Sequence, residues 1–245
     1  MNRSRQKDKP AKMSWVEKAR LNAAAQAVRE LKDNTTVGLG SGTTVLKALD
    51  LAADRVKKEH LDVNWVPTSY QTEIAARRLG LKTTTLSEDT ELDLAIDGAD
   101  QVQWRSLDLV KGGGAALLRE KIVDSTTKKL VIVIDERKLA KTLGGDQPIP
   151  VEITPFAYHA TLAKINKISE KATIREALGG KVGPVITDNG NLIVDAYFRN
   201  LRRPDIINEK LREIPGVVET GFFLQMCDIA YVGRKDGKVD ILRRS

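Results

Sequence analysis

Residues 129–135 read KLVIVID, and every position from Leu130 to Ile134 is apolar. A strand with one face in solvent alternates apolar and polar residues, whereas a strand covered on both faces is apolar throughout. Residues 92–97, LDLAID, are also largely apolar and end in an aspartate. Helical patterns lie between such strands along the chain. This alternation predicts a parallel sheet joined by right-handed helical crossovers.

The segments on the N-terminal side of these strands carry their own signals. Ser14 and Glu17 form a capping box, which predicts a helix to about Lys32. Thr68 and Gln71 have the same spacing and predict the start of another helix. The remaining expected elements are strands near 36–39 and 63–66 and helices at about 45–58, 68–80 and 115–126. The fold class is therefore α/β, with a parallel-sheet, Rossmann-like domain.

The pattern changes after the two glycines at 144–145. The following elements are expected in the order β-α-β-β-β-α-β, which resembles a ferredoxin-like unit with one extra strand. The Asn-Gly pair at 189–190 suits a type I′ turn inside a hairpin. We expect a smaller ferredoxin-like α+β domain at 146–217, and an α/β domain built from 13–145 together with 218–245.

Charge is concentrated at the ends of the chain. The net charge is +7, and residues 1–12 hold five basic side chains and one acidic one. We expect this segment to be a disordered, solvated basic tail. A nucleic-acid role would depend on the tails alone, and only 4% of residues are aromatic, which leaves few side chains for stacking on bases. We expect no nucleic-acid partner.

Cysteine content and hydropathy bear on location. Cys227 is the single cysteine, so no internal disulfide is possible, and a reducing compartment is expected. No apolar run is long enough to span a bilayer, and no signal peptide is expected at the N-terminus. These features predict a cytoplasmic protein without a membrane partner.

Three loops follow predicted strands, at the edge where open parallel sheets bind ligands. The first is GLGSGTT at 38–44, which leads into a helix. Its spacing matches neither a P-loop nor a dinucleotide fingerprint. It is either a phosphate cradle, with glycine N–H groups and the helix N-terminus facing an anion, or a tight turn.

The second and third loops carry charged side chains. Asp97 and Asp100 lie three positions apart and suit proton transfer or hydrogen bonds to sugar hydroxyls, although both could be ordinary turn residues. Lys111 precedes the three glycines at 112–114, and Glu120 follows on the next helix. The glycines either admit a ligand to bare backbone or only turn the chain. Together the loops suit a carboxylate base beside donors for an oxyanion.

Other chemistries lack the residues they need. His60 and His159 are the only histidines, and neither falls in a candidate loop. No grouping has the spacing of metal ligands, so we expect no metal and no cofactor. Cys227 lies in an apolar stretch and is expected to be structural.

Seven segments resemble type A ribose-5-phosphate isomerases in order and spacing. They are VGLGSGTT (37–44), AIDGADQV (95–102), LVKGGGAALLREKIV (109–123), VIDERKLAKTLG (133–144), PIPVEI (148–153), VITDNGN (185–191) and IPGVVETGFF (214–223). The resemblance covers nearly the whole chain from about Trp15. It implies interconversion of D-ribose 5-phosphate and D-ribulose 5-phosphate through an enediolate without a metal, in the non-oxidative pentose phosphate pathway. It also implies a homodimer or homotetramer.

The resemblance further implies roles for individual residues. Glu120 would be the base that moves a proton between C2 and C1, and Asp97, Asp100 and Lys111 would line the place where the sugar ring opens. The implied substrate-binding residues are Ser41, Gly42, Thr43, Thr44, Gly98, Ala99, Gly112, Gly113, Gly114 and, for the phosphate, Lys138.

The chain departs from the family pattern at a few positions. Gln101 stands where a glutamate is usual, and we expect activity to survive because that glutamate is not taken as the base. GSGTT at 40–44 replaces a similar hydroxyl-rich loop, and Phe222 replaces a leucine. The alternatives are a non-catalytic phosphosugar-binding module, a deaminase or CoA transferase of related fold, and a nucleic-acid binder. The presence of Glu120 beside the glycine loop favours the isomerase.

Overall fold

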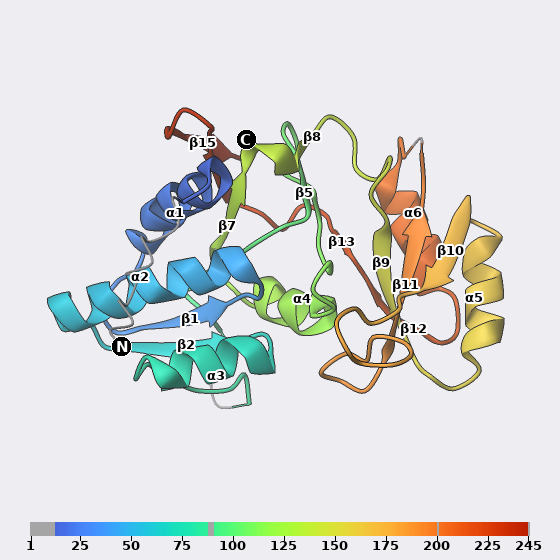
Figure 1. Cartoon of the computed structure of the whole chain (residues 1–245), viewed down its shortest axis with the longest axis horizontal. Helices are drawn as coiled ribbons and strands as arrows, with labels where there is room; N and C mark the ends of the chain where they lie inside the picture. The colour runs from blue at the N-terminus through green and yellow to red at the C-terminus, as the bar shows by residue number, and fades with distance from the viewer. Residues whose placement is uncertain (1–12, 88–90, 200, 245) are drawn as a thin grey trace, which may run out of the picture.

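The computed structural model describes residues 13–87, 91–199 and 201–244, so the predicted tail at 1–12 lies outside the described residues. Its largest sheet has seven strands in the order β15-β14-β7-β4-β1-β2-β3 (Figure 1). All neighbouring strands in it are parallel except the β14–β15 pair. The strands are β1 (Thr35–Leu39), β2 (Val63–Pro67), β3 (Lys82–Thr83), β4 (Leu94–Asp97), β7 (Leu130–Asp135), β14 (Ile229–Gly233) and β15 (Val239–Arg243).

The two apolar runs form the centre of this sheet. Strands β4 and β7 are adjacent, and all of their residues are buried. The prediction of a parallel α/β sheet is therefore confirmed. The helices that pack against it are α1 (Trp15–Val28), α2 (Thr43–Glu59), α3 (Tyr70–Arg78) and α4 (Leu117–Ser125). Helix α1 contacts β7 and β14 so closely that a Cβ at Gly233 would lie 2.0 Å from the Ala19 carbonyl oxygen.

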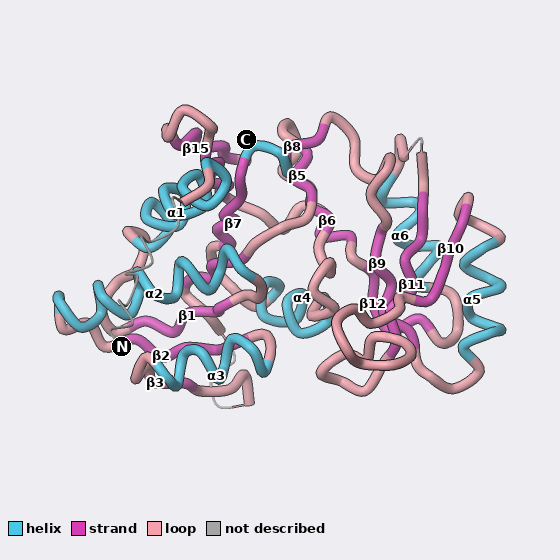
Figure 2. Tube along the Cα trace, viewed as in Figure 1, coloured by secondary structure: helices cyan, strands magenta, loops and turns pink. Residues whose placement is uncertain are grey.

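A second sheet lies beside the first (Figure 2). It has four antiparallel strands in the order β10-β11-β9-β12, with helices α5 and α6 between them in sequence. These elements are β9 (Ile149–Ile153), α5 (Tyr158–Asn166), β10 (Lys171–Ile174), β11 (Leu192–Tyr197), α6 (Pro204–Arg212) and β12 (Val217–Thr220). The βαββαβ order and antiparallel pairing are those of a ferredoxin-like unit. The predicted domain limits remain a prediction, and β12 runs across the one at 217.

The second sheet differs from the prediction in two details. The expected extra strand at 184–187 is reduced to two isolated bridges, one between Pro184 and Glu176 and one between Ile186 and Leu192. The turn is not type I′, because Gly190 has a positive φ of 78° but Asn189 does not. Instead the Gly190 N–H donates to the Thr187 carbonyl, and the Asn189 amide donates to the buried Glu152. The long-range contact of Asn189 with Glu152 thus outweighs the local turn preference of the Asn-Gly pair.

A small third sheet connects the two larger ones. It runs β13-β6-β5-β8, with β5 (Gln101–Gln103), β6 (Leu109–Val110), β8 (Leu139–Ala140) and β13 (Phe222–Phe223). The Gln101 side chain exchanges two hydrogen bonds with the backbone of Gly144, at 2.7 and 2.9 Å. Phe222 is buried in the core of the second sheet. Within the described residues, no helix is long and apolar enough to cross a membrane.

Candidate active site

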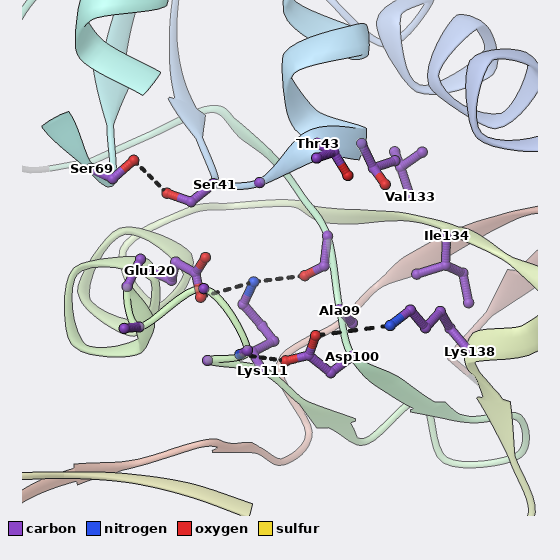
Figure 3. Close-up of a pocket in the computed structure, with 18 of the residues that line it drawn as sticks. Ser41, Thr43, Ser69, Ala99, Asp100, Lys111, Glu120, Val133, Ile134 and Lys138 are labelled. Carbon is purple, nitrogen blue, oxygen red and sulfur yellow. Dashed lines mark hydrogen bonds and ion pairs between the residues drawn. The ribbon is translucent and has the colours of Figure 1, made fainter. Parts of the chain in front are cut away.

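A cavity of about 460 Å³ opens where β1, β4 and β7 end. These strands are parallel neighbours, so their carboxyl ends meet at one edge of the sheet. The loop after β6 and the start of α4 form the opposite wall (Figure 3). All of the site residues predicted from the sequence line this cavity except Asp97. The three loops, separated by up to 76 positions from Gly38 to Gly114, therefore meet in one place.

The first loop presents unpaired donors to the cavity. Gly42 is the N-cap of the 17-residue helix α2, has a φ of 93° and makes no side-chain cap. The first N–H groups of a helix have no partner inside it, so they are available to an anion. The Ser41 hydroxyl lies 2.8 Å from that of Thr68 and 2.7 Å from that of Ser69. This end of the cavity is rich in neutral donors.

Two cationic side chains add to this end. Arg20, from α1, donates to Thr43 Oγ1 over 3.2 Å and to Asp135 over 2.8 Å. Lys138, in the short 3-10 turn after β7, is one-third exposed and lies 4.0 Å from Asp100. A helix N-terminus flanked by an arginine and a lysine is a suitable place for a phosphate group.

The second loop holds its two aspartates in different environments. Asp97 is fully buried below the cavity wall, where it accepts from the N–H groups of Gly98 (2.6 Å) and Ser41 (3.3 Å). The space beside it is so narrow that a Cβ at Gly40 would lie 1.8 Å from Asp97 Oδ1. Asp100 faces the cavity and accepts from the Gly113 N–H over 2.7 Å. Asp97 thus has a supporting position, in contrast to the expectation that it lines the sugar site.

The third loop places Lys111 among buried carboxylates. Its ammonium nitrogen lies 2.7 Å from Asp97 and 2.6 Å from the Gly98 carbonyl oxygen. It also lies 3.3 Å from Glu120 (Figure 3). The glycines allow this approach, because Gly112 has a φ of 100° and a Cβ there would lie 2.7 Å from Leu117. The N-terminal turn of α4 then points Glu120 into the same cluster.

Burial sets the proton affinities of this pair. It raises the pKa of the Glu120 carboxyl to about 8, although the nearby Lys111 ammonium acts in the opposite direction. Burial also opposes the charge on Lys111, but the carboxylates of Asp97 and Glu120 outweigh it and raise the lysine pKa. Lys111 therefore stays protonated, while Glu120 can exchange a proton close to neutral pH.

The structure adds cavity residues that were not predicted. They are Arg20, Ser69, Gln71, Ala115, Ala116, Val133, Ile134, Asp135 and Asp188. Asp135 ends the apolar run at 129–135 on the same sheet edge as Asp97, and this position could have identified it. The N-cap of α3 is Ser69, which accepts from the Thr72 N–H, and not Thr68 as the spacing predicted.

The second sheet supports the cavity from outside. Arg175, which follows β10, donates to the carbonyl oxygens of Gly112 (2.8 Å) and Gly113 (3.0 Å). Its guanidinium is held by Asp195 on β11. Arg119 on α4 donates to the Asp188 carbonyl and to Asn189 in the turn before β11. These contacts join the glycine loop and the helix of Glu120 to the second sheet.

Gln101 and the histidines lie outside the cavity wall. The Gln101 side chain faces Gly144 through the two hydrogen bonds described above. No group of three or more histidine, cysteine or acidic side chains suited to a metal ion occurs among residues 13–87, 91–199 and 201–244. Cys227 is buried, as expected of a structural residue.

Comparison with known proteins gives consistent matches. The family model of ribose 5-phosphate isomerase A (phosphoriboisomerase A) matches residues 64–237. Ribose-5-phosphate isomerase A of Methanococcus aeolicus is 42% identical over 92% of this chain and 94% of its own length. The human ribose-5-phosphate isomerase is 39% identical over 95% of this chain and 75% of its own length.

Solved structures agree with these matches. Ribose 5-phosphate isomerase A from Methanocaldococcus jannaschii superposes with a TM-score of 0.88 at 38% identity, over 93% of this chain and 99% of that one. A D-ribose-5-phosphate isomerase in complex with phospho-erythronic acid gives a TM-score of 0.89 at 37% identity, over 95% and 100% of the two chains.

Proposed function

The chain belongs to the ribose 5-phosphate isomerase A family and interconverts D-ribose 5-phosphate and D-ribulose 5-phosphate, and we propose that Glu120 is the base of this reaction. The observation that carries the proposal is the buried contact between Glu120 and Lys111 at the wall of the cavity. A carboxyl group with a pKa near the working pH can both take and return a proton.

The reaction moves two hydrogens. In the aldose-to-ketose direction, the Glu120 carboxylate takes the proton from C2 while negative charge develops on the C1 oxygen, which gives an enediolate. The carboxyl group then returns the proton to C1. Meanwhile the hydroxyl proton leaves O2 and a proton reaches O1. No atom is gained or lost, which fits an isomerisation.

The other residues have roles that follow from their positions. The positive charge of Lys111, with the N–H groups of the glycine loop, stabilises the oxyanion in a site removed from bulk water. Asp100 faces the cavity and is placed to move the hydroxyl protons. Asp97 holds Lys111 by its 2.7 Å ion pair. Lys111 occupies the place among the carboxylates that a metal cation would take, which supports proton transfer without a metal.

The phosphate is proposed to bind at the start of α2. Its partners would be the N–H groups of Gly42, Thr43 and Thr44 and the hydroxyls of Ser41, Thr43 and Thr44, with Lys138 and Arg20 beside them. Phospho-erythronic acid, the ligand of the solved relative, carries a phosphate and a carboxylate on a four-carbon chain. It therefore carries a second anionic group besides its phosphate, as the enediolate of the phosphorylated sugar does.

Substitution of Glu120 by glutamine tests the proposed base. The amide cannot accept the proton, so kcat should fall about 10²- to 10⁴-fold while binding of the phosphosugar stays nearly unchanged. Ketose formation from ribose 5-phosphate, measured with a chelator present, gives the rate. Glu73→Gln on α3, where the carboxylate pairs with exposed Arg77, is the matched control and should keep its activity. Retention of most of the rate by Glu120→Gln would refute the proposed role.

We further propose a cytoplasmic homodimer or homotetramer. The cellular location rests on the metabolic role of the family and on the single, buried cysteine. Exposed apolar side chains on the second sheet and its loops, among them Phe156, Leu178 and Val182, support self-association. The mass of the protein in solution tests this assignment, and a monomer at micromolar concentration would contradict it.

A further inference from the structure

A third carboxyl group, that of Asp124, is buried next to the Lys111 cluster. Asp124 lies one helical turn after Glu120 on α4 and is 4% exposed. Neither of its oxygens has a hydrogen-bond partner when the group is treated as a carboxylate. A buried ionised carboxylate without a partner is strongly unfavourable. The mechanism proposed above does not use this group.

The ammonium of Lys111 cannot serve as the missing partner. It has three N–H donors, and three acceptors already surround it: Asp97, Glu120 and the Gly98 carbonyl. Three carboxyl groups therefore share one cation in a dry environment, which favours protonation of at least one of them.

The other charged groups near Asp124 are also engaged. On its far side lies a second cavity, at whose rim Lys121 pairs with Glu219, Lys128 with Asp93, and Arg244 with Asp228. Arg212 at the same rim lies 3.9 Å from Glu219. The thiol of Cys227, before β14, is the remaining titratable neighbour; burial, first of all, raises its pKa to about 12, so it stays neutral.

Among the carboxylates around Asp124, Asp97 is the one best suited to accept a hydrogen bond from it. Its own carboxylate already receives two backbone N–H groups and the Lys111 ammonium, all of which favour the ionised form. Burial, first of all, and then the Asp97 carboxylate raise the pKa of the Asp124 carboxyl group, and two carboxyl groups that lie close together favour one proton between them. The proton therefore belongs on Asp124, the member with no other donor.

We propose that Asp124 is a positioning residue, whose carboxyl group holds a proton in the resting enzyme and donates a hydrogen bond to Asp97. This bond fixes the Asp97 carboxylate against Lys111, so that the ammonium stays aligned on the reacting end of the sugar. Glu120 is then left as the carboxyl group that titrates during turnover. The inference rests on the proposed role of Glu120 as the base.

Two substitutions at position 124 distinguish a protonated carboxyl group, which donates a hydrogen bond, from a negatively charged carboxylate. Asp124→Asn keeps a neutral donor of the same shape, so kcat/KM should stay within about threefold of wild type and the midpoint of its acidic limb should not move. Asp124→Ala removes the donor, and kcat should fall about tenfold with KM nearly unchanged. Ser125→Ala, the next position on α4, is the matched control and should behave as wild type in both measurements.

Infrared spectroscopy tests the proton directly and does not depend on turnover. Spectra at neutral pH are compared for Glu120→Gln and for the double variant Glu120→Gln, Asp124→Asn, so that Glu120 does not contribute. Loss of a protonated-carboxyl stretch in the double variant is expected. Persistence of the whole signal would overturn the proposal, as would full turnover of Asp124→Ala. A downward shift of the acidic limb by more than about half a pH unit in Asp124→Asn would also overturn it, because it would mean that a negative charge had been removed.

The two proposals can fail separately. If Glu120→Gln retains activity, the base is wrong, whatever the infrared result. If Glu120→Gln is inactive but the double variant keeps the carboxyl signal, only the assignment of Asp124 fails. Should Asp124→Ala not fold, the asparagine variant and the spectra still decide the question.

Discussion

The two ends of the cavity hold their lysines differently. Lys111 is 3% exposed in its side chain and has three acceptors within 3.3 Å, whereas Lys138 is one-third exposed and its ion pair with Asp100 spans 4.0 Å. The first cation is already neutralised by the protein, and the second still has donors for a ligand. The end around Lys111 and Glu120, the reacting end, needs fixed charges that set the pKa of the base. The end around Lys138, the holding end, needs free donors that bind the phosphate. This contrast predicts different kinetic effects at the two ends.

The largest effect is expected from Lys111→Met. The substitution leaves Asp97 without its cation in a dry site, and breaking a buried pair in this way typically costs about 3–5 kcal/mol of stability. Turnover should fall about 100-fold or more in the molecules that still fold, because the positive charge nearest to the oxyanion is lost. Urea unfolding and steady-state kinetics measure the two effects.

Lys121→Met is the matched control for this substitution. Lys121 is the next residue after Glu120 on α4 and also makes a partly buried pair, with Glu219, but it does not line the active cavity. It should lose some stability and keep its turnover. Equal loss of turnover in Lys111→Met and Lys121→Met would show that the position of Lys111 in the active cavity is not what turnover depends on.

At the holding end, Lys138→Ala should act mainly on binding. A charge-assisted hydrogen bond to phosphate is worth about 1.5–3 kcal/mol, so KM should rise roughly 10- to 100-fold with a much smaller change in kcat. Ribose without its phosphate should be turned over equally poorly by wild type and variant. A kcat loss that exceeds the KM change would place Lys138 at the reacting end and break the comparison.

The response to pH is a graded effect, because it changes the ionisation of Glu120 without removing a side chain. Because burial raises the Glu120 pKa to about 8, the carboxylate needed for proton abstraction increases as pH rises towards that value. The kcat/KM of the enzyme should therefore rise about tenfold per pH unit below 8 and level off above it. If kcat/KM stayed constant between about pH 6 and 8, the assignment of Glu120 as the base would be contradicted.

Stability should move in the opposite direction. The folded protein keeps the Glu120 proton up to a higher pH than the unfolded chain, where the carboxyl group titrates near its ordinary value of 4.5. The free energy of unfolding should therefore fall as pH rises between about 4.5 and 8. Glu120→Gln should weaken this dependence, and thermal unfolding across the same range measures it.

The reacting end is the part that the sequence predicts best. The runs at 92–97 and 129–135 locate the central strands, because burial on both faces leaves only apolar residues there. Lys111, the glycines at 112–114 and Glu120 are close in sequence, so local pattern places them on one loop and helix. The expected sheet and the family membership are confirmed, while the roles of the individual residues stay predictions.

The parts that could not be predicted depend on contacts across long separations. Arg20 reaches the cavity by pairing with Asp135, 115 positions away, and nothing in the sequence of α1 signals that pair. Asp188 reaches it through a turn whose shape is set by the buried Glu152 rather than by its Asn-Gly pair. Asp97 was expected at the surface of the site, but hydrogen bonds from two loops keep it below the surface.

Arg175 has a consequence for engineering of this enzyme. Its guanidinium binds the carbonyl side of the peptide units at Gly112 and Gly113, and Asp195 anchors it within the second sheet. A chimera that takes its second sheet from a relative must therefore bring both of these residues in register. A graft without them would leave two carbonyl groups of the glycine loop without their donor, even though no residue of the cavity wall in the first sheet had been exchanged.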